Sequence, residues 1–306
     1  MKIDALFKIT SVLFLIAFGM ASSHAETFSS TVSDKYQQFY DAESVVADKP
    51  DFSRSMGVRA AYDKIISHLQ NETFLRALKA DGVDLLFRAA YDAAFYTFDK
   101  KYVADMELDL RLLKSKGGAS ERHYGDLYEM MIRARLFDLA ESFAEKNSFP
   151  HEKLPSLDSS AYEGSGPSEL HIDATGEKWK RSSITLSPGR EIIVIGHPLC
   201  HFSQEATAYI ESNQKLFKIF MAHSKWIMPQ DGTPKSIVVS KWNASHPELP
   251  MSYIYRQDEF GQIDAWSTPN FYFFVDGRLV GHISGWPPSG GPEALIRELR
   301  KVGLLH

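Results

Sequence analysis

Residues 191–204 have the sequence EIIVIGHPLCHFSQ. The first part, Glu191–Ile195, is β-branched and apolar without alternation, which predicts a strand covered on both faces. A glycine and a proline end this strand, and a helical pattern with Phe202 on its apolar face follows over residues 202–213. Cys200 is therefore expected where a strand passes into a helix N-terminus. Free N–H groups and the helix dipole favour a thiolate at such a position.

A second stretch, residues 267–285, reads STPNFYFFVDGRLVGHISG. It predicts a strand over Phe271–Val275, a turn at Asp276-Gly277 and a second strand over Leu279–Ile283. Thr268-Pro269 comes directly before this hairpin, and the pattern of Pro292–Val302 predicts a final helix.

This order of elements resembles the thioredoxin superfamily: strand, cysteine turn, helix, a later strand and helix, Thr-Pro, hairpin and final helix. The resemblance covers Ile184–Leu305 and is closest to TlpA-like and disulfide-exchange members. It implies an α/β domain with a central mixed sheet flanked by helices. It also implies a cis peptide bond at Thr268-Pro269, with the proline facing Cys200.

The chain departs from the pattern of that superfamily at three positions. The usual C-x-x-C motif is C-x-x-S here, because Ser203 takes the place of the second cysteine. Leu199 replaces a tryptophan that often precedes the first cysteine. Val194 stands where many thioredoxins carry a buried acid.

The N-terminus has the features of a targeting segment. Residues 1–25 carry two lysines, an apolar run and the small-x-small site Ser23-His24-Ala25, which together predict a signal peptide. The alternative is a retained N-terminal anchor. An exported protein, periplasmic or secreted, is the expectation, with no membrane span after signal cleavage. Export implies an oxidising compartment, in which the single cysteine can form no disulfide within the chain.

Four segments are expected, beginning with the signal peptide. Residues 26–150 predict an all-α helical domain, either tetratricopeptide-like or an ordinary antiparallel bundle. Residues 151–180 are rich in Ser, Gly and Pro and predict a linker, in which His171–Lys180 could pair as an extra edge strand. Residues 181–306 are expected to form the thioredoxin-like domain. Within that domain, Leu216–Trp226 is interpreted as a strand. If the helices are repeats, they form a groove for a protein partner.

The chemistry is expected to centre on Cys200 as the nucleophile. His201 is assigned the role of tuning its charge, and Ser203 that of stabilising it locally. A lone thiol can attack a disulfide of a protein or small-thiol substrate but cannot resolve the mixed disulfide, so an external thiol donor must complete the reaction. Isomerase-like or reductase-like exchange follows. The rival interpretation is a redox-silent thioredoxin-fold scaffold that binds its partner through the helical domain.

The substrate is expected to meet three further residues. Thr268 and Pro269 resemble the superfamily's substrate-binding corner, where backbone groups pair with an extended peptide. Trp266 is placed at the border of the same cleft, with core packing as the alternative. Neither a cofactor nor a metal is expected. The net charge of −5 gives no reason to expect nucleic acid as a partner.

Overall fold

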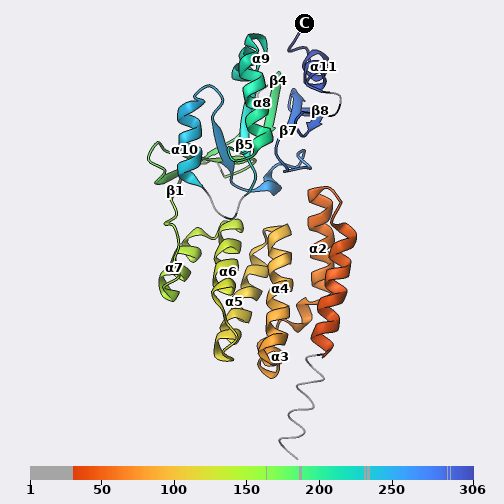
Figure 1. Ribbon diagram of the computed structural model, residues 1–306, viewed down its shortest axis with the longest axis vertical. Coiled ribbons are helices and arrows are strands. Elements are labelled where there is room, and N and C mark those ends of the chain that lie inside the picture. The colour runs from red at the N-terminus through yellow and green to blue at the C-terminus, as the bar shows by residue number, and fades with distance from the viewer. Residues whose placement is uncertain are drawn as a thin grey trace, which may run out of the picture. The chain divides into compact units, whose positions relative to one another are not determined.

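The computed structural model describes residues 30–162, 164–185, 188–230, 232, 235–287, 289 and 291–306. The predicted signal peptide, residues 1–25, lies outside these residues. The chain divides into two compact units, with Phe149 the last residue of the first and Pro150 the first of the second. Figure 1 shows the helices of the first unit in red to yellow-green and the elements of the second in green to blue. Among the described residues, no helix has an apolar stretch long enough to span a bilayer.

The first unit is all-helical, as the sequence predicts. A helix over residues 30–46 is followed by α2 (Asp51–Ile65), η1 (Ser67–Leu69), α3 (Glu72–Ala77), α4 (Ala80–Thr97), α5 (Lys100–Ser115), α6 (Glu121–Arg133) and α7 (Phe137–Asn147). The helix over residues 30–46 is longer than the sequence suggests. Val32 and Phe39 lie about two turns apart on the same face of this helix, and both are fully buried. Whether these helices form tetratricopeptide repeats stays a prediction.

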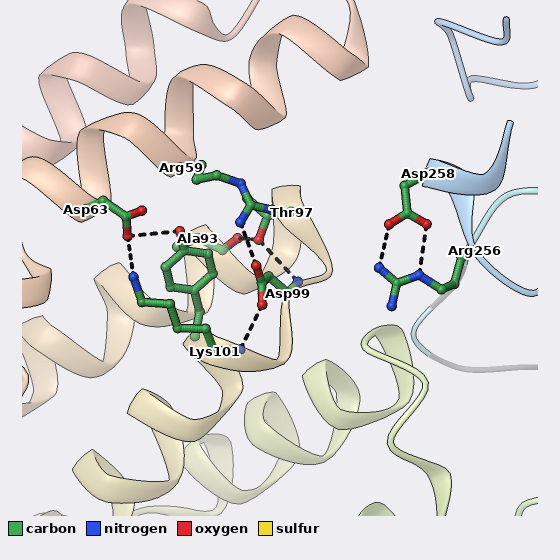
Figure 2. Close-up of polar contacts among 9 residues, drawn as sticks. Arg59, Asp63, Ala93, Thr97, Asp99, Lys101, Arg256 and Asp258 are labelled. Atoms are coloured by element: carbon green, nitrogen blue, oxygen red, sulfur yellow. Dashed lines mark hydrogen bonds and ion pairs between the residues drawn. The ribbon is translucent and has the colours of Figure 1, made fainter. Parts of the chain in front are cut away.

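Side-chain caps and ion pairs set the register of these helices. Asn71 accepts a hydrogen bond from the Phe74 N–H at the start of α3, and Asp99 accepts one from the Lys101 N–H at the start of α5. Asp99 also pairs with Arg59 at 2.6 Å, and Lys101 pairs with Asp63 at 2.7 Å (Figure 2). Two ion pairs therefore join α2 to the first turn of α5.

The second unit is built on one eight-stranded sheet. Its strands are β1 (Ser156–Ala161), β2 (Ser168–Ile172), β3 (Lys178–Ser183), β4 (Arg190–Ile195), β5 (Ser224–Met228), β6 (Met251–Ile254), β7 (Asn270–Val275) and β8 (Arg278–Ser284). Their order across the sheet is β1-β3-β2-β6-β5-β4-β7-β8. The helices are α8 (His201–Ser212), α9 (Gln214–His223), α10 (Ser236–Ser245) and α11 (Glu293–Lys301), with a short η2 (Gln257–Glu259).

The centre of this sheet is the predicted strand before the cysteine. β4 pairs in parallel with β5 and antiparallel with β7, and β7 continues into β8 through the Asp276-Gly277 turn. Both turn residues have positive φ, at 49° and 74°, as a two-residue hairpin of this kind requires. β4 is covered on both faces, because four consecutive residues from Ile192 to Ile195 are buried.

The interpretation of Leu216–Trp226 as a strand is wrong. Most of it is α9, and only its last residues enter β5. Asn213 caps this helix by accepting hydrogen bonds from the N–H groups of Lys215 and Leu216. Leu216 and Phe220, one helical turn apart, are the buried pair. The strand was predicted from an alternation of Ile219, Met221 and His223, and these residues lie in the helix outside its buried pair.

The predicted linker, residues 151–180, is only partly irregular. It contains β1, β2 and the start of β3, which extend the sheet beyond β6. β2 joins the sheet through a buried acid: Glu169 is 3% exposed and accepts hydrogen bonds from Lys225 Nζ, at 2.8 Å, and from Ser252 Oγ. Burial alone would raise the pKa of Glu169, but His171 and Lys225 outweigh it and lower the pKa to about 2. Because Glu169 is a polar residue at a buried position, β2 does not show the apolar alternation by which a strand is predicted from sequence.

A second polar group, on the neighbouring strand β3, holds the other edge of β2 in place. Arg181 on β3 lies between the rings of Tyr162 and Tyr255, 3.6 and 3.5 Å from their centroids. It also donates to Glu259 of η2 at 2.9 Å. Figure 2 draws a further pair of the second unit, in which Arg256 Nε donates to Asp258 at 2.8 Å. The loop after β6 is therefore tied to the added strands.

Candidate functional site

Cys200 lies where the sequence places it, at the end of the turn that leaves β4. Its backbone N–H donates to the His197 carbonyl at 3.0 Å, and the Leu199 N–H donates to His197 Nδ1 at 3.1 Å. Cys200 is then the N-cap residue of α8. Its side chain is half-buried, so the sulfur lies at the N-terminus of the helix while part of it stays accessible.

The Thr-Pro segment meets this turn because of the sheet register. Ile195, the last residue of β4, pairs with Asn270, the first residue of β7. The chain after β4 and the chain before β7 therefore lie at the same end of the sheet. There the Thr268-Pro269 peptide bond is cis, and Cys200 Sγ lies 3.3 Å from the Thr268 carbonyl oxygen.

The second unit is a mixed α/β sheet with helices, which fits a thioredoxin-like fold. The sheet order β5-β4-β7-β8, the cysteine at the start of the helix after β4, and the cis-proline before β7 together support this assignment. The thioredoxin-like unit also carries strands outside that pattern, since β6 and the β1-β3-β2 group continue the sheet beyond β5.

Comparisons with known proteins add little to this assignment. No protein-family model matches the chain, and no curated protein gives a significant match. A search of solved structures finds a thioredoxin-like protein from Bacteroides caccae, determined at 1.90 Å. That protein is 13% identical, with 82% of this chain and 93% of that chain covered at a TM-score of 0.28. A likeness this weak carries no argument, so the assignment depends on strand order and on the two segments that meet at Cys200.

The electrostatic surroundings of Cys200 favour its thiolate. Partial burial raises the pKa of the thiol, but hydrogen bonds with the Thr268 and Ser203 side chains and with the Ser203 and Phe202 N–H groups outweigh it. The net effect is a lowered pKa, which raises the nucleophilic fraction at neutral pH.

Ser203, in the place of a second cysteine, is fully buried. Its Oγ accepts a hydrogen bond from the His197 N–H at 3.3 Å, which leaves its own proton available for Cys200. The hydroxyl therefore joins the cysteine turn to the first turn of α8. It supports the thiolate but supplies no second sulfur.

His201 points away from this network. Its side chain is 75% exposed, and its Nε2 lies 2.9 Å from Glu205 Oε1 one helical turn along. The groups that lower the pKa of Cys200 named above come from Thr268, Ser203 and Phe202. The role of His201 in tuning the thiol stays a prediction.

The structure places Trp266 in the apolar core. Its ring is 8% exposed and packs edge-on against Phe260, with the ring centroids 5.5 Å apart. It belongs to a buried cluster that includes Tyr272 of β7. A border position in a substrate cleft stays a prediction for this residue.

Two apolar residues beside the sulfur are exposed. Leu199 and Phe202 are each 51% exposed, although Phe202 is expected on the inward face of its helix. The inward residues of α8 are instead Ser203, Ala206, Thr207 and Ile210. The sequence does not separate these two phases, because Ala206 and Ile210 belong to both stripes. Across the described part of the chain, no group of three or more His, Cys, Asp or Glu side chains is placed to hold a metal ion.

Proposed function

We propose that the thioredoxin-like unit carries out thiol–disulfide exchange with Cys200 as a single-thiol nucleophile. The observation that carries the proposal is the position of the sulfur. It is partly accessible, it belongs to the N-cap residue of α8, and as a thiol it donates to the Thr268 carbonyl at 3.3 Å, directly before a cis-proline. The start of the helix favours the thiolate, and the contact with the Thr268 carbonyl holds the sulfur beside the cis-proline, where an extended substrate can reach it.

The reaction needs an outside thiol. The Cys200 thiolate attacks one sulfur of a substrate disulfide, forming a new S–S bond while the other substrate sulfur leaves as a thiolate. A donor thiolate then attacks the Cys200 sulfur, releases the first substrate sulfur as a thiol and leaves Cys200 joined to the donor. A second donor thiol releases Cys200 and forms the donor disulfide. In an isomerase-like cycle, a thiolate of the substrate itself attacks the bound substrate sulfur and releases Cys200.

The surroundings of the sulfur favour a protein substrate with apolar residues near its disulfide. Leu199 and Phe202 flank Cys200 and together expose two large apolar side chains. Backbone groups next to Pro269 offer hydrogen bonds to an extended peptide. We further propose that the chain is exported, on the basis of the predicted signal peptide, because disulfide substrates are common only in oxidising compartments.

Alkylation tests the proposal directly, because the chain has one cysteine and every label reports on Cys200. We expect iodoacetamide to react with the native chain at about pH 7 several times faster than with the urea-unfolded chain. Cys200→Ser is expected to abolish mixed-disulfide formation with glutathione disulfide. Equal rates for native and unfolded chains would refute the proposal and leave the redox-silent scaffold as the better account.

A further inference from the structure

The first unit contains a groove that the proposed chemistry does not use. It lies among α5, α6 and α7, which Figure 1 shows in yellow to yellow-green, and it encloses about 690 Å³. All of its lining residues belong to the first unit. A volume of this size is within the range of ligand-binding pockets.

The floor of the groove is apolar. It is formed by residues such as Leu108, Tyr124, Leu139 and Phe143. Leu139 is 39% exposed, so it is one of the large apolar side chains that the unit leaves in contact with solvent. Tyr124 and Phe143 stack with their ring centroids 6.0 Å apart, which holds this floor between α6 and α7. An apolar floor that is preformed and open favours a partner with apolar side chains of its own.

The rim of the groove is cationic, although the chain as a whole has a net charge of −5. Arg111, Lys114 and Lys146 line it, with Glu107 as the one acid. Arg111 already contacts Glu72 at 3.1 Å. Among the described residues, neither Lys114 nor Lys146 forms a salt bridge, although the charge of Lys146 acts on Glu107. Both lysines can therefore attract an acidic partner.

We propose that this groove binds an acidic amphipathic segment of a partner protein. Apolar side chains of the segment lie on the floor, and its carboxylates face Lys114 and Lys146. The open shape suits a peptide that lies across three helices, and the positive rim selects against basic segments by like-charge repulsion. The proposal is independent of the thiol chemistry of the second unit.

Glu107 allows a test in which a substitution should strengthen binding instead of weakening it. Burial raises the pKa of Glu107, and the charge of Lys146 counters that effect. The Glu107 carboxylate repels an acidic partner at neutral pH. Glu107→Gln is therefore expected to strengthen binding of the acidic segment, whereas loss of the lysines weakens it.

The experiment uses the full chain and a display library of random 12-residue peptides. We expect selected peptides to combine acidic and apolar residues, and a fluorescent copy of one of them to bind in an anisotropy titration. The double variant Lys114→Glu, Lys146→Glu is expected to weaken that binding about tenfold or more. Added salt should weaken it as well. Lys100→Glu, at the other end of α5 and outside the groove, is the matched control and should change it less than about twofold.

Three results would overturn the proposal: no enriched peptides, enrichment of neutral or basic peptides, or equal effects of the double variant and the control. Leu139→Ser separates charge from apolar contact and should also weaken binding. Circular dichroism of each variant shows whether the helices are intact. Because Leu139, Lys114 and Lys146 are exposed, these substitutions should leave the fold unchanged.

Discussion

The stability of the helical unit should fall as the pH rises, and Asp92 of α4 is the clearest cause. Burial raises the pKa of this carboxyl group from 3.8 to about 7, with Glu43 and Asp126 adding to the effect and Arg88 opposing it. The three acids come from the helix over residues 30–46, from α4 and from α6. Their mutual repulsion therefore acts across two helix interfaces.

Proton linkage gives the sign and the size of the effect of Asp92 on the free energy of unfolding. A carboxyl group with a raised pKa holds its proton more tightly in the folded state, so its stabilising effect is complete below pH 3.8 and is lost as the pH rises through about 7. The full shift corresponds to about 4 kcal/mol of unfolding free energy. Part of Asp92 remains in contact with solvent, so we expect about 2–3 kcal/mol.

Asp92→Asn removes this ionisation with little change of shape. At about pH 8 the variant should be more stable than the wild type by about 2–3 kcal/mol, and at about pH 4 the two should differ by less than about 0.5 kcal/mol. Other acids of the unit with raised pKa values, such as Asp105, give the wild type a pH dependence of the same sign. The difference between variant and wild type isolates Asp92.

Urea unfolding of the full chain provides the assay. All five tryptophans lie in the second unit, so tryptophan fluorescence follows that unit, whereas far-UV circular dichroism is dominated by the helical unit. Only the circular dichroism transition should shift in Asp92→Asn. Asp48→Asn, at an exposed position after the helix over residues 30–46, should shift neither transition. A variant no more stable than the wild type at about pH 8 would refute the reasoning.

Two further predictions concern the second unit. Ser203→Ala removes a hydroxyl that hydrogen-bonds Cys200 and the His197 N–H. The pKa of the thiol should therefore rise, and alkylation at about pH 7 should slow about two- to fivefold. An unchanged rate would show that the backbone N–H groups suffice. Glu169→Gln should lower the stability of this unit by about 1–3 kcal/mol at neutral pH, measured by tryptophan fluorescence during urea unfolding. Because the pKa of Glu169 is lowered to about 2, the difference should shrink as the pH falls from 4.5 towards 2, and a difference that persists in acid would contradict this account.

The sequence by itself determined the elements whose cause is local. The β-branched run before Gly196, the Asp276-Gly277 turn and the helical periodicity of the first unit each depend on neighbours within a few residues. The resemblance to the thioredoxin superfamily, which depends on the order of these elements, implied that Pro269 would face Cys200.

Tertiary structure decided the features that depend on residues distant in the chain. Within residues 151–180, Glu169 of β2 pairs with Lys225 and Ser252, which lie 56 and 83 residues away in the sequence. Packing against the sheet decided which face of α8 is buried, and that face leaves Phe202 exposed. Packing also decided that residues 214–223 form a helix with Leu216 and Phe220 buried. The environment of the sulfur is likewise tertiary, since Thr268 reaches Cys200 only through the pairing of β4 with β7. Local propensity is a weak preference, and packing and polar satisfaction across the chain override it wherever the two disagree.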